Sequence, residues 1–138
     1  MVKRIKDAGK QDATGRIKAH AVSGASILGE RPKFSFAYLD KDYCLSKCTK
    51  DEKAALADKL HQLSQLSWLD INNAARHGQG YEKINRTSIK GRIPPSLTED
   101  VNILAFRFFG KAPMVGYRVA EVFYIVWLDR QFVLYDHG

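Results

Sequence analysis

The chain has 138 residues and carries 22 Lys and Arg against 15 Asp and Glu, a formal net charge of +7. Hydrophobic residues make up 45% of it and aromatic residues 11%, which indicates a globular protein rather than a disordered basic tail. No apolar run reaches the roughly 18 residues of a membrane-spanning helix, and the N-terminus lacks the apolar core of a signal peptide. We therefore expect one cytoplasmic domain with a polyanion as its partner.

The N-terminal quarter is basic and poor in large apolar residues. Residues 1–33 are rich in Lys, Arg, Gly, Ser and Ala, and apolar residues such as Ile5 are scattered among them. A short amphipathic helix over residues 15–28 fits the spacing, although Gly24 within it disfavours helix formation. We predict that residues 1–33 form a basic arm, weakly structured or helical, and that residues 34–138 form a single α+β domain.

The clearest helix begins near residue 50. Thr49 stands three residues before Glu52, which is the spacing of a capping box. Leucines then recur at helical spacing, and Leu60 stands at the centre of the stripe. The pattern predicts a helix that ends near Ser67, a second short helix over residues 68–75, and Leu60 as a core residue.

Residues with high β-propensity dominate the second half of the chain. Aromatic and branched side chains replace the Ala and Leu of the helix, and they alternate over short stretches separated by turn residues. With an earlier aromatic stretch, they predict a small antiparallel sheet, largely a meander, packed by the N-terminal helix or helices. The expected strands are Phe34–Tyr38, Ile103–Phe109, Met114–Val119, Val122–Leu128 and Phe132–Tyr135.

Two arginines interrupt these apolar strands. Arg107 lies within the stretch FRFF and Arg118 within GYRV. An arginine in such a strand must reach solvent along its stem, pair with an acid or face a cleft. Two on one sheet favour a shared cleft, and the alternative is that each faces solvent or pairs with a nearby acid such as Asp129.

The C-terminal sequence YDHG places Tyr135 and His137 two residues apart, so in a strand both side chains point to one face. Histidine takes and gives a proton near neutral pH, and a tyrosine can orient or stack on a base. The alternative is a frayed end with a solvated histidine.

The connection over residues 76–92 is basic and contains glycines and one tyrosine, a composition suited to tracking phosphates and stacking bases. The alternative is a solvated basic loop. The candidate nucleic-acid-binding residues are Lys83, Arg86, Lys90 and Arg92 in this segment and Lys111 in the sheet.

These residue types suit one kind of phosphodiester chemistry. Cleavage of RNA by its own 2′-OH needs a base, an acid and cations that stabilise the charge on the phosphorane, and it needs no metal. Cys44 and Cys48 have no second pair of ligands at a common zinc spacing, so we interpret them as reduced thiols. No serine stands in a nucleophile elbow. We predict no metal and no cofactor.

The order of strand, capped helix, basic connection and meander, with GYRV, FYIVWLD and FVLYDH, resembles the RelE-like family of toxin ribonucleases over about residues 34–138. The resemblance implies a RelE- or barnase-like microbial ribonuclease architecture that cleaves mRNA, commonly on the ribosome, and an antitoxin that blocks the site. Arg118 looks like the arginine of the family's second meander strand, and Tyr135 and His137 look like its C-terminal pair. Arg107 has no counterpart in the family pattern, and Phe123 stands where many relatives have arginine.

The leading hypothesis is therefore a metal-independent RNA endonuclease, the toxin of a toxin–antitoxin system. In it, Arg107 and Arg118 stabilise the phosphorane, and Tyr135 or His137 transfers protons. The alternatives are a non-catalytic nucleic-acid-binding module that uses the same basic face, and an interaction protein whose basic arm docks an acidic protein.

Overall fold

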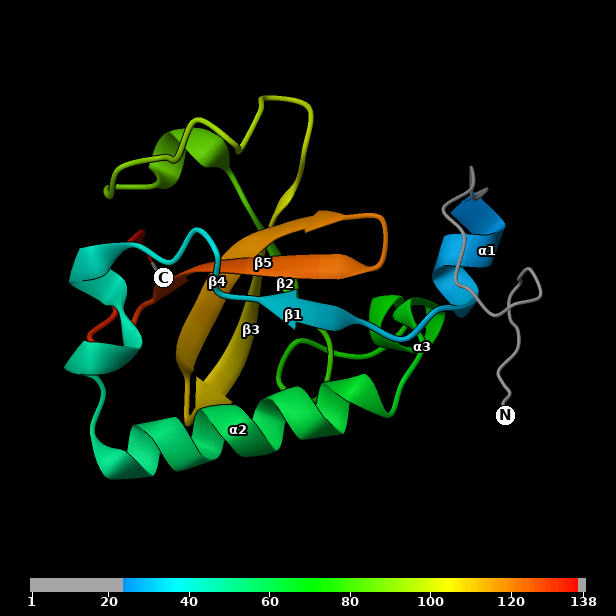
Figure 1. The fold of residues 1–138 in the computed structure, drawn as a ribbon, viewed down its shortest axis with the longest axis horizontal. Coiled ribbons are helices and arrows are strands. Elements are labelled where there is room, and N and C mark those ends of the chain that lie inside the picture. The colour runs from blue at the N-terminus through cyan, green and yellow to red at the C-terminus, as the bar shows by residue number, and fades with distance from the viewer. Residues whose placement is uncertain (1–23, 137–138) are drawn as a thin grey trace.

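A five-stranded sheet organises the chain, with strand order β1-β5-β4-β3-β2 (Figure 1). The structure, a computed structural model, describes residues 24–136. The predicted meander is confirmed: β3 (Ile103–Phe109), β4 (Ala112–Val119) and β5 (Val122–Leu128) pair antiparallel in sequence order. A three-residue strand within the basic connection, β2 (Glu82–Ile84), pairs antiparallel with β3. The α+β class is thus confirmed.

Two features of the sheet differ from the sequence prediction. The first strand is shorter, β1 (Lys33–Ser35), and it pairs parallel with β5, so the sheet is mixed rather than antiparallel. Parallel pairing requires a long crossover, and the helices and three strands between β1 and β5 supply it. The predicted strand Phe132–Tyr135 is wrong, because the chain turns after β5 instead of pairing again.

The two helices predicted after Thr49 are confirmed with different ends, and α1 (Gly24–Gly29) overlaps only the end of the helix expected over residues 15–28. Helix α2 spans Lys50–Ser64 and α3 spans Trp68–Asn72. The rest of the predicted helix over 15–28, like most of the basic arm, lies outside the described residues. Short 3-10 turns complete the fold: η1 (Lys41–Tyr43), η2 (Leu45–Lys47) and η3 (Arg86–Ser88). Within residues 24–136 no helix is long and apolar enough to cross a membrane.

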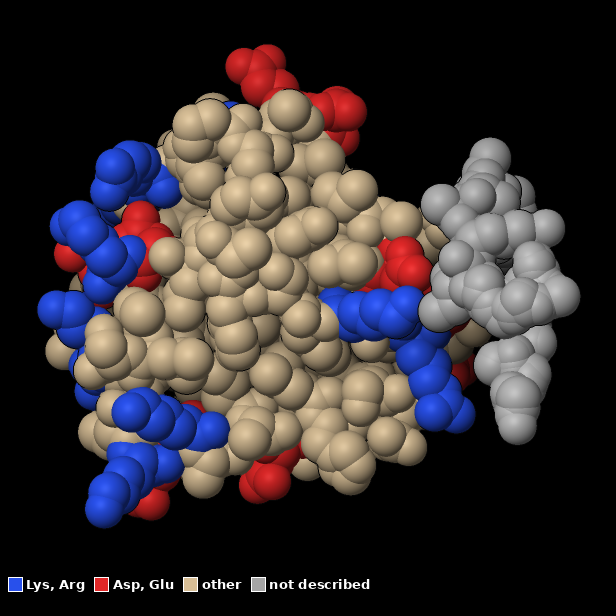
Figure 2. Space-filling model, viewed as in Figure 1, with Lys and Arg blue, Asp and Glu red and all other residues tan. Residues whose placement is uncertain are grey.

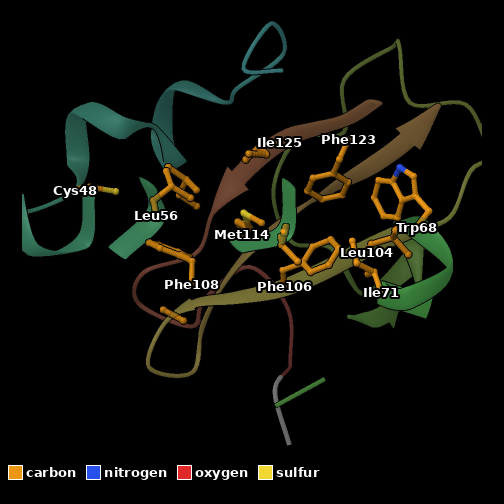
Figure 3. Packing of buried hydrophobic residues seen from close by; sticks show 13 residues of the cluster. Cys48, Leu56, Trp68, Ile71, Leu104, Phe106, Phe108, Met114, Phe123 and Ile125 are labelled. Carbon is orange, nitrogen blue, oxygen red and sulfur yellow. The ribbon is translucent and has the colours of Figure 1, made fainter. Parts of the chain in front are cut away.

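The sheet has a hydrophobic core on each face. Helices α2 and α3 cover one face, here called the helix face, where Phe106 and Phe123 pack edge to face with ring centroids 5.2 Å apart (Figure 3). Segment 84–101 and the C-terminal residues Leu134 and Tyr135 cover the other, the loop face. Because neighbouring residues of a strand point to opposite faces, each side chain's position in its strand decides which core it joins.

Gly116 lets β4 and β5 approach closely at an irregularity in their pairing. The register shifts between Val115 and Gly116. A β-carbon at Gly116 would lie 1.8 Å from the Tyr124 carbonyl oxygen, so no other residue fits there without moving the strand. The extra residue lies in β5, so β4 alternates regularly: Met114 joins the helix-face core, Val115 and Tyr117 join the loop-face core, and Arg118 follows on the helix face.

The N-terminus of α2 is tied to the segment after β5. The Thr49 N–H donates to Glu52 Oε1 at 2.7 Å, which completes the predicted capping box, and Arg130 Nε donates to the same oxygen at 2.7 Å. The Glu52 side chain is 9% exposed. Burial would raise its pKa, but the Thr49 N–H and the Arg130 guanidinium outweigh burial and lower it.

The leucine stripe of α2 is buried unevenly. Leu56 is 2% exposed and Leu63 is fully buried, whereas Leu60 is only partly buried at the edge of the core. We expect Leu63→Ala to cost about 2 to 5 kcal/mol of unfolding free energy, and Leu60→Ala less than half as much. Chemical denaturation measures both, and equal losses would contradict the observed orientation of the helix.

The Glu52 ion pair predicts how stability depends on pH. The pKa of Glu52 is lower in the folded chain than its ordinary value of 4.5, so its contribution is present above that value and lost as pH falls through the folded pKa. Glu52→Gln removes this contribution. We expect the stability difference between the parent and Glu52→Gln to shrink as pH falls below about 5. A difference that is constant with pH in denaturation curves would show that the charge contributes nothing.

Candidate active site

A pocket of about 280 Å³ opens on the loop face of the sheet. Its side chains come from the segment before β2, from β2 and β3, from the β3–β4 turn and from the C-terminal segment. We call it the arginine pocket. The residues that matter for its chemistry are Arg76, Glu82, Arg107, Lys111, Phe132 and Tyr135.

Arg107 lies where the edge of β3 is uncovered. On the loop face it follows Ala105, and β2 begins opposite Ala105, so that strand stops short of Arg107. On its other side Arg107 pairs with Pro113 of β4. Within residues 24–136 the half-buried Arg107 side chain makes no hydrogen bond or ion pair. Its guanidinium is therefore available to an anion that enters the pocket.

Tyr135 reaches the pocket through a turn that Asp129 holds. The buried Asp129 carboxylate accepts the Val133 N–H at 2.9 Å and the Leu134 N–H at 3.1 Å. Phe132, inside the turn, has the left-handed backbone angle φ = 60°. The Leu134 carbonyl then accepts the Lys90 N–H at 2.7 Å, which anchors the segment against the loop. Tyr135 follows, 5% exposed.

The surroundings of Tyr135 keep its phenol neutral. Burial raises its pKa well above the ordinary range, and the negative charges of Glu82 and Asp129 raise it further. The positive charges of Arg107 and Arg76 oppose this only in part. At neutral pH Tyr135 is therefore a hydrogen-bond donor and a poor general base.

Glu82 is the carboxylate of the arginine pocket, and the sequence reasoning missed it. It lies at the start of β2, and its Oε2 is 3.1 Å from Arg76 Nη1. Among the described residues that line the pocket it is the one acid. An exposed acid in a basic segment gives no signal by itself, and only its pairing opposite Ala105 places it near Arg107.

The loop that carries Arg76 is held by a buried lysine of α2. Lys59 Nζ donates to the Gly78 carbonyl at 3.0 Å and to Gln79 Oε1 at 2.9 Å. Burial lowers the pKa of Lys59. A β-carbon at Gly80 would lie 2.1 Å from the Ala74 carbonyl, so the turn requires glycine there. These contacts position Arg76 without touching the pocket.

Arg118 lies on the opposite face of the sheet. Its guanidinium carbon is 4.7 Å from the centroid of the Trp68 ring, a cation–π contact on the helix face. It lines a separate hollow with Lys83. The prediction that Arg107 and Arg118 share one cleft is therefore wrong, because their positions in β3 and β4 point them to opposite faces.

The other predicted cations do not join the arginine pocket either, except Lys111. Lys90 and Arg92 line a larger cavity of about 610 Å³ near η1 and η2. Arg86 Nη1 donates to the Thr98 carbonyl at 2.9 Å and so braces its own loop. Figure 2 shows Lys and Arg gathered on the side of the molecule where η1, η2 and the C-terminal end lie in Figure 1.

Two further predictions concern His137 and the cysteines. His137 lies outside the described residues. Cys44 and Cys48 are free thiols. In the part of the chain that the structure describes, no three His, Cys, Asp or Glu side chains gather as a metal site would require.

Comparison of the chain with protein-family models, with curated proteins and with solved structures finds no match. We therefore infer function from the chemistry of the pocket.

The left-handed backbone at Phe132 should affect the stability of variants at this position. The ring lines the pocket and is 44% exposed, yet the residue occupies backbone space that favours glycine. Phe132→Gly and Phe132→Ala both remove the ring, but only glycine relieves the strain. We expect the glycine variant to be more stable than the alanine variant by about 1 kcal/mol in thermal or chemical unfolding. Equal stability would show that the turn carries no strain.

Proposed function

We propose that the protein is a metal-independent RNA endonuclease that cleaves by 2′-OH attack in the arginine pocket. One observation carries the proposal: Arg107 and Lys111, which have no ionic partner within residues 24–136, face Glu82 and Tyr135 in one pocket. The cations can stabilise the phosphorane, the carboxylate can act as the base, and the neutral phenol can donate a hydrogen bond to the leaving oxygen.

Each group has a role that follows from its surroundings. The scissile phosphate binds Arg107 and Lys111, which stabilise the charge that develops on the phosphorane. Glu82 accepts the 2′-OH proton as the 2′-oxygen attacks phosphorus. The bond to the 5′-oxygen breaks, and that oxygen leaves as a hydroxyl, so the products carry a 2′,3′-cyclic phosphate and a 5′-OH.

The leaving oxygen needs a proton. Neutral Tyr135 donates a hydrogen bond to it, and the raised pKa of Tyr135 disfavours complete transfer. His137, two residues further along the chain, is the proton donor that the sequence predicts. Arg118 has no part in this scheme.

The biological role that we propose is that of a toxin whose antitoxin covers the pocket. It rests on the resemblance to RelE-like toxins, with which the chain shares the order of helices, meander and C-terminal aromatic residue. Induced expression tests it: growth should stop, and co-expression of a protein encoded next to the gene should restore it. Unimpaired growth at high expression would contradict the toxin role without contradicting RNA cleavage.

A binding module without catalysis is the second candidate, because Lys90 and Arg92 line a cavity apart from the arginine pocket. It predicts RNA binding with no cleavage. Variants that remove a group used only in binding would weaken affinity and leave saturated turnover unchanged.

Arg107 gives the sharpest test of the cleavage scheme. We expect Arg107→Ala to lower the single-turnover rate of RNA cleavage in excess chelator about 100-fold or more, because a preorganised charge at the phosphorane is lost. Arg118→Ala is the matched comparison, an arginine removed from the opposite face, and should change the rate less than about threefold. An equal loss in both variants, with the fold intact, would move the chemistry away from the arginine pocket.

A further inference from the structure

Three tyrosine rings form a row on the loop face, and the last ring is open to solvent. Tyr117 and Tyr124 stack with centroids 5.2 Å apart and planes at 20°, and Tyr124 meets Tyr38 at 5.4 Å. Tyr117 is buried, and its hydroxyl donates to Ser96 Oγ at 2.9 Å. Tyr38 is 45% exposed. The row therefore presents an aromatic surface that another flat ring could extend.

The backbone around Tyr38 is held in place. It lies in the turn after β1, which the Leu39 N–H closes by donating to the Phe36 carbonyl at 3.1 Å. The Asp40 N–H donates to the Val126 carbonyl at 2.7 Å, which ties the turn to β5. The exposed ring is thus fixed rather than carried on a loose loop, so little order would be lost on binding.

A hollow of about 290 Å³ lies beside the Tyr38 ring. Its walls are largely apolar, formed by Pro94, Pro95 and Val126, and two cations, Lys41 and Arg92, stand among them. Within residues 24–136 Arg92 makes no hydrogen bond or ion pair. Asp40 also lines the hollow, but its carboxylate caps η1 by accepting the Asp42 N–H at 2.8 Å. We call this hollow the tyrosine slot.

A cavity of about 610 Å³ lies between the tyrosine slot and the segment that lines the arginine pocket. Arg92 and Asp40 line both the slot and the cavity of about 610 Å³ that also holds Lys47 and Lys90. That cavity reaches Val133, which lies between Phe132 and Tyr135 in the segment that lines the arginine pocket. A polyanion bound at the arginine pocket could follow these cations to the slot.

We propose that the tyrosine slot binds a nucleobase of single-stranded RNA, stacked on Tyr38, while Arg92 contacts a neighbouring phosphate. This inference rests on the proposed function for its ligand. Apolar flat walls with a cation at the edge suit a base and its phosphate, because stacking needs an aromatic face and no particular hydrogen-bond pattern. The bases of a duplex are already stacked in pairs, so the slot selects unpaired strands.

Binding of uncleavable RNA tests the slot separately from catalysis. Fluorescein-labelled 2′-O-methyl oligonucleotides of about 12 and about 3 nucleotides would be titrated with the full chain and followed by anisotropy. We expect Tyr38→Ala to weaken binding of the longer strand about 5- to 150-fold and binding of the shorter strand less, because a longer strand has more nucleotides with which to reach the slot and the arginine pocket together. Tyr38→Phe, which keeps the ring, should bind like the parent.

Phe36 provides the matched control. It is an aromatic side chain of similar exposure, 40%, two residues from Tyr38, and it does not line the slot. If Tyr38→Ala and Phe36→Ala bind the longer strand equally well, or if the parent binds neither strand, the slot is disproved. Equal weakening of the short strand by Tyr38→Ala would also disprove it, because the ring would then act at the arginine pocket or on the fold.

The two proposals fail in different ways. If RNA binding does not depend on Tyr38 but the protein cleaves RNA, the slot is disproved and the endonuclease proposal is unaffected. Tyr38-dependent binding, together with no cleavage of unmodified RNA of the same sequence, supports the slot and overturns the endonuclease.

Discussion

The buried carboxylate of Asp129 determines where the chain goes after the last strand. A carboxylate without exposure is tolerated only when its oxygens accept hydrogen bonds, and the N–H groups of Val133 and Leu134 provide them. To bring those groups back, the chain must turn sharply at Phe132, which it does in left-handed backbone space. Leu134 thereby enters the loop-face core and Tyr135 enters the arginine pocket.

The same turn sets the chemistry available to Tyr135. If residues 132–135 had continued as a strand at the sheet edge, successive side chains would point to opposite faces and the Tyr135 phenol would remain partly solvated. Folded back, it is buried close enough to Glu82 and Arg107 for their charges to act on it. A neutral donor, one acid and available cations thus meet in one pocket, although they come from segments far apart in the sequence.

Regular elements could be predicted from the sequence, because their signals are local. The capping box at Thr49 and the apolar run over residues 122–128 each depend on neighbours within one element. The parallel pairing of β1 could not be predicted, because three residues carry no signal for their partner. Leu60 was assigned to the centre of the core from spacing alone, whereas Leu63 and Leu56 are the more deeply buried.

The candidate site was predicted only in part, because the pairing register of the strands decides which side chains meet. Arg107, Lys111 and Tyr135 were predicted as functional residues, and the structure brings them together. Arg118 was expected beside them, but the register shift between Arg107 and Phe109 changes how β3 aligns with β4, and no local signal reports it. The partners Arg76 and Glu82 become visible only once β2 is paired with β3.

If the arginine pocket directs attack by the 2′-OH of RNA, cleavage of each bond depends on the hydroxyl group beside it. The most direct measurement maps the cleavage position in a defined RNA in excess chelator, then repeats the reaction with a single 2′-deoxy nucleotide on the 5′ side of that bond. We expect the deoxy substitution to abolish cleavage at that bond alone, and unmodified RNA to yield 2′,3′-cyclic phosphate and 5′-OH ends. Cleavage that persists at the deoxy position, or that leaves 5′-phosphate ends, would contradict this mechanism.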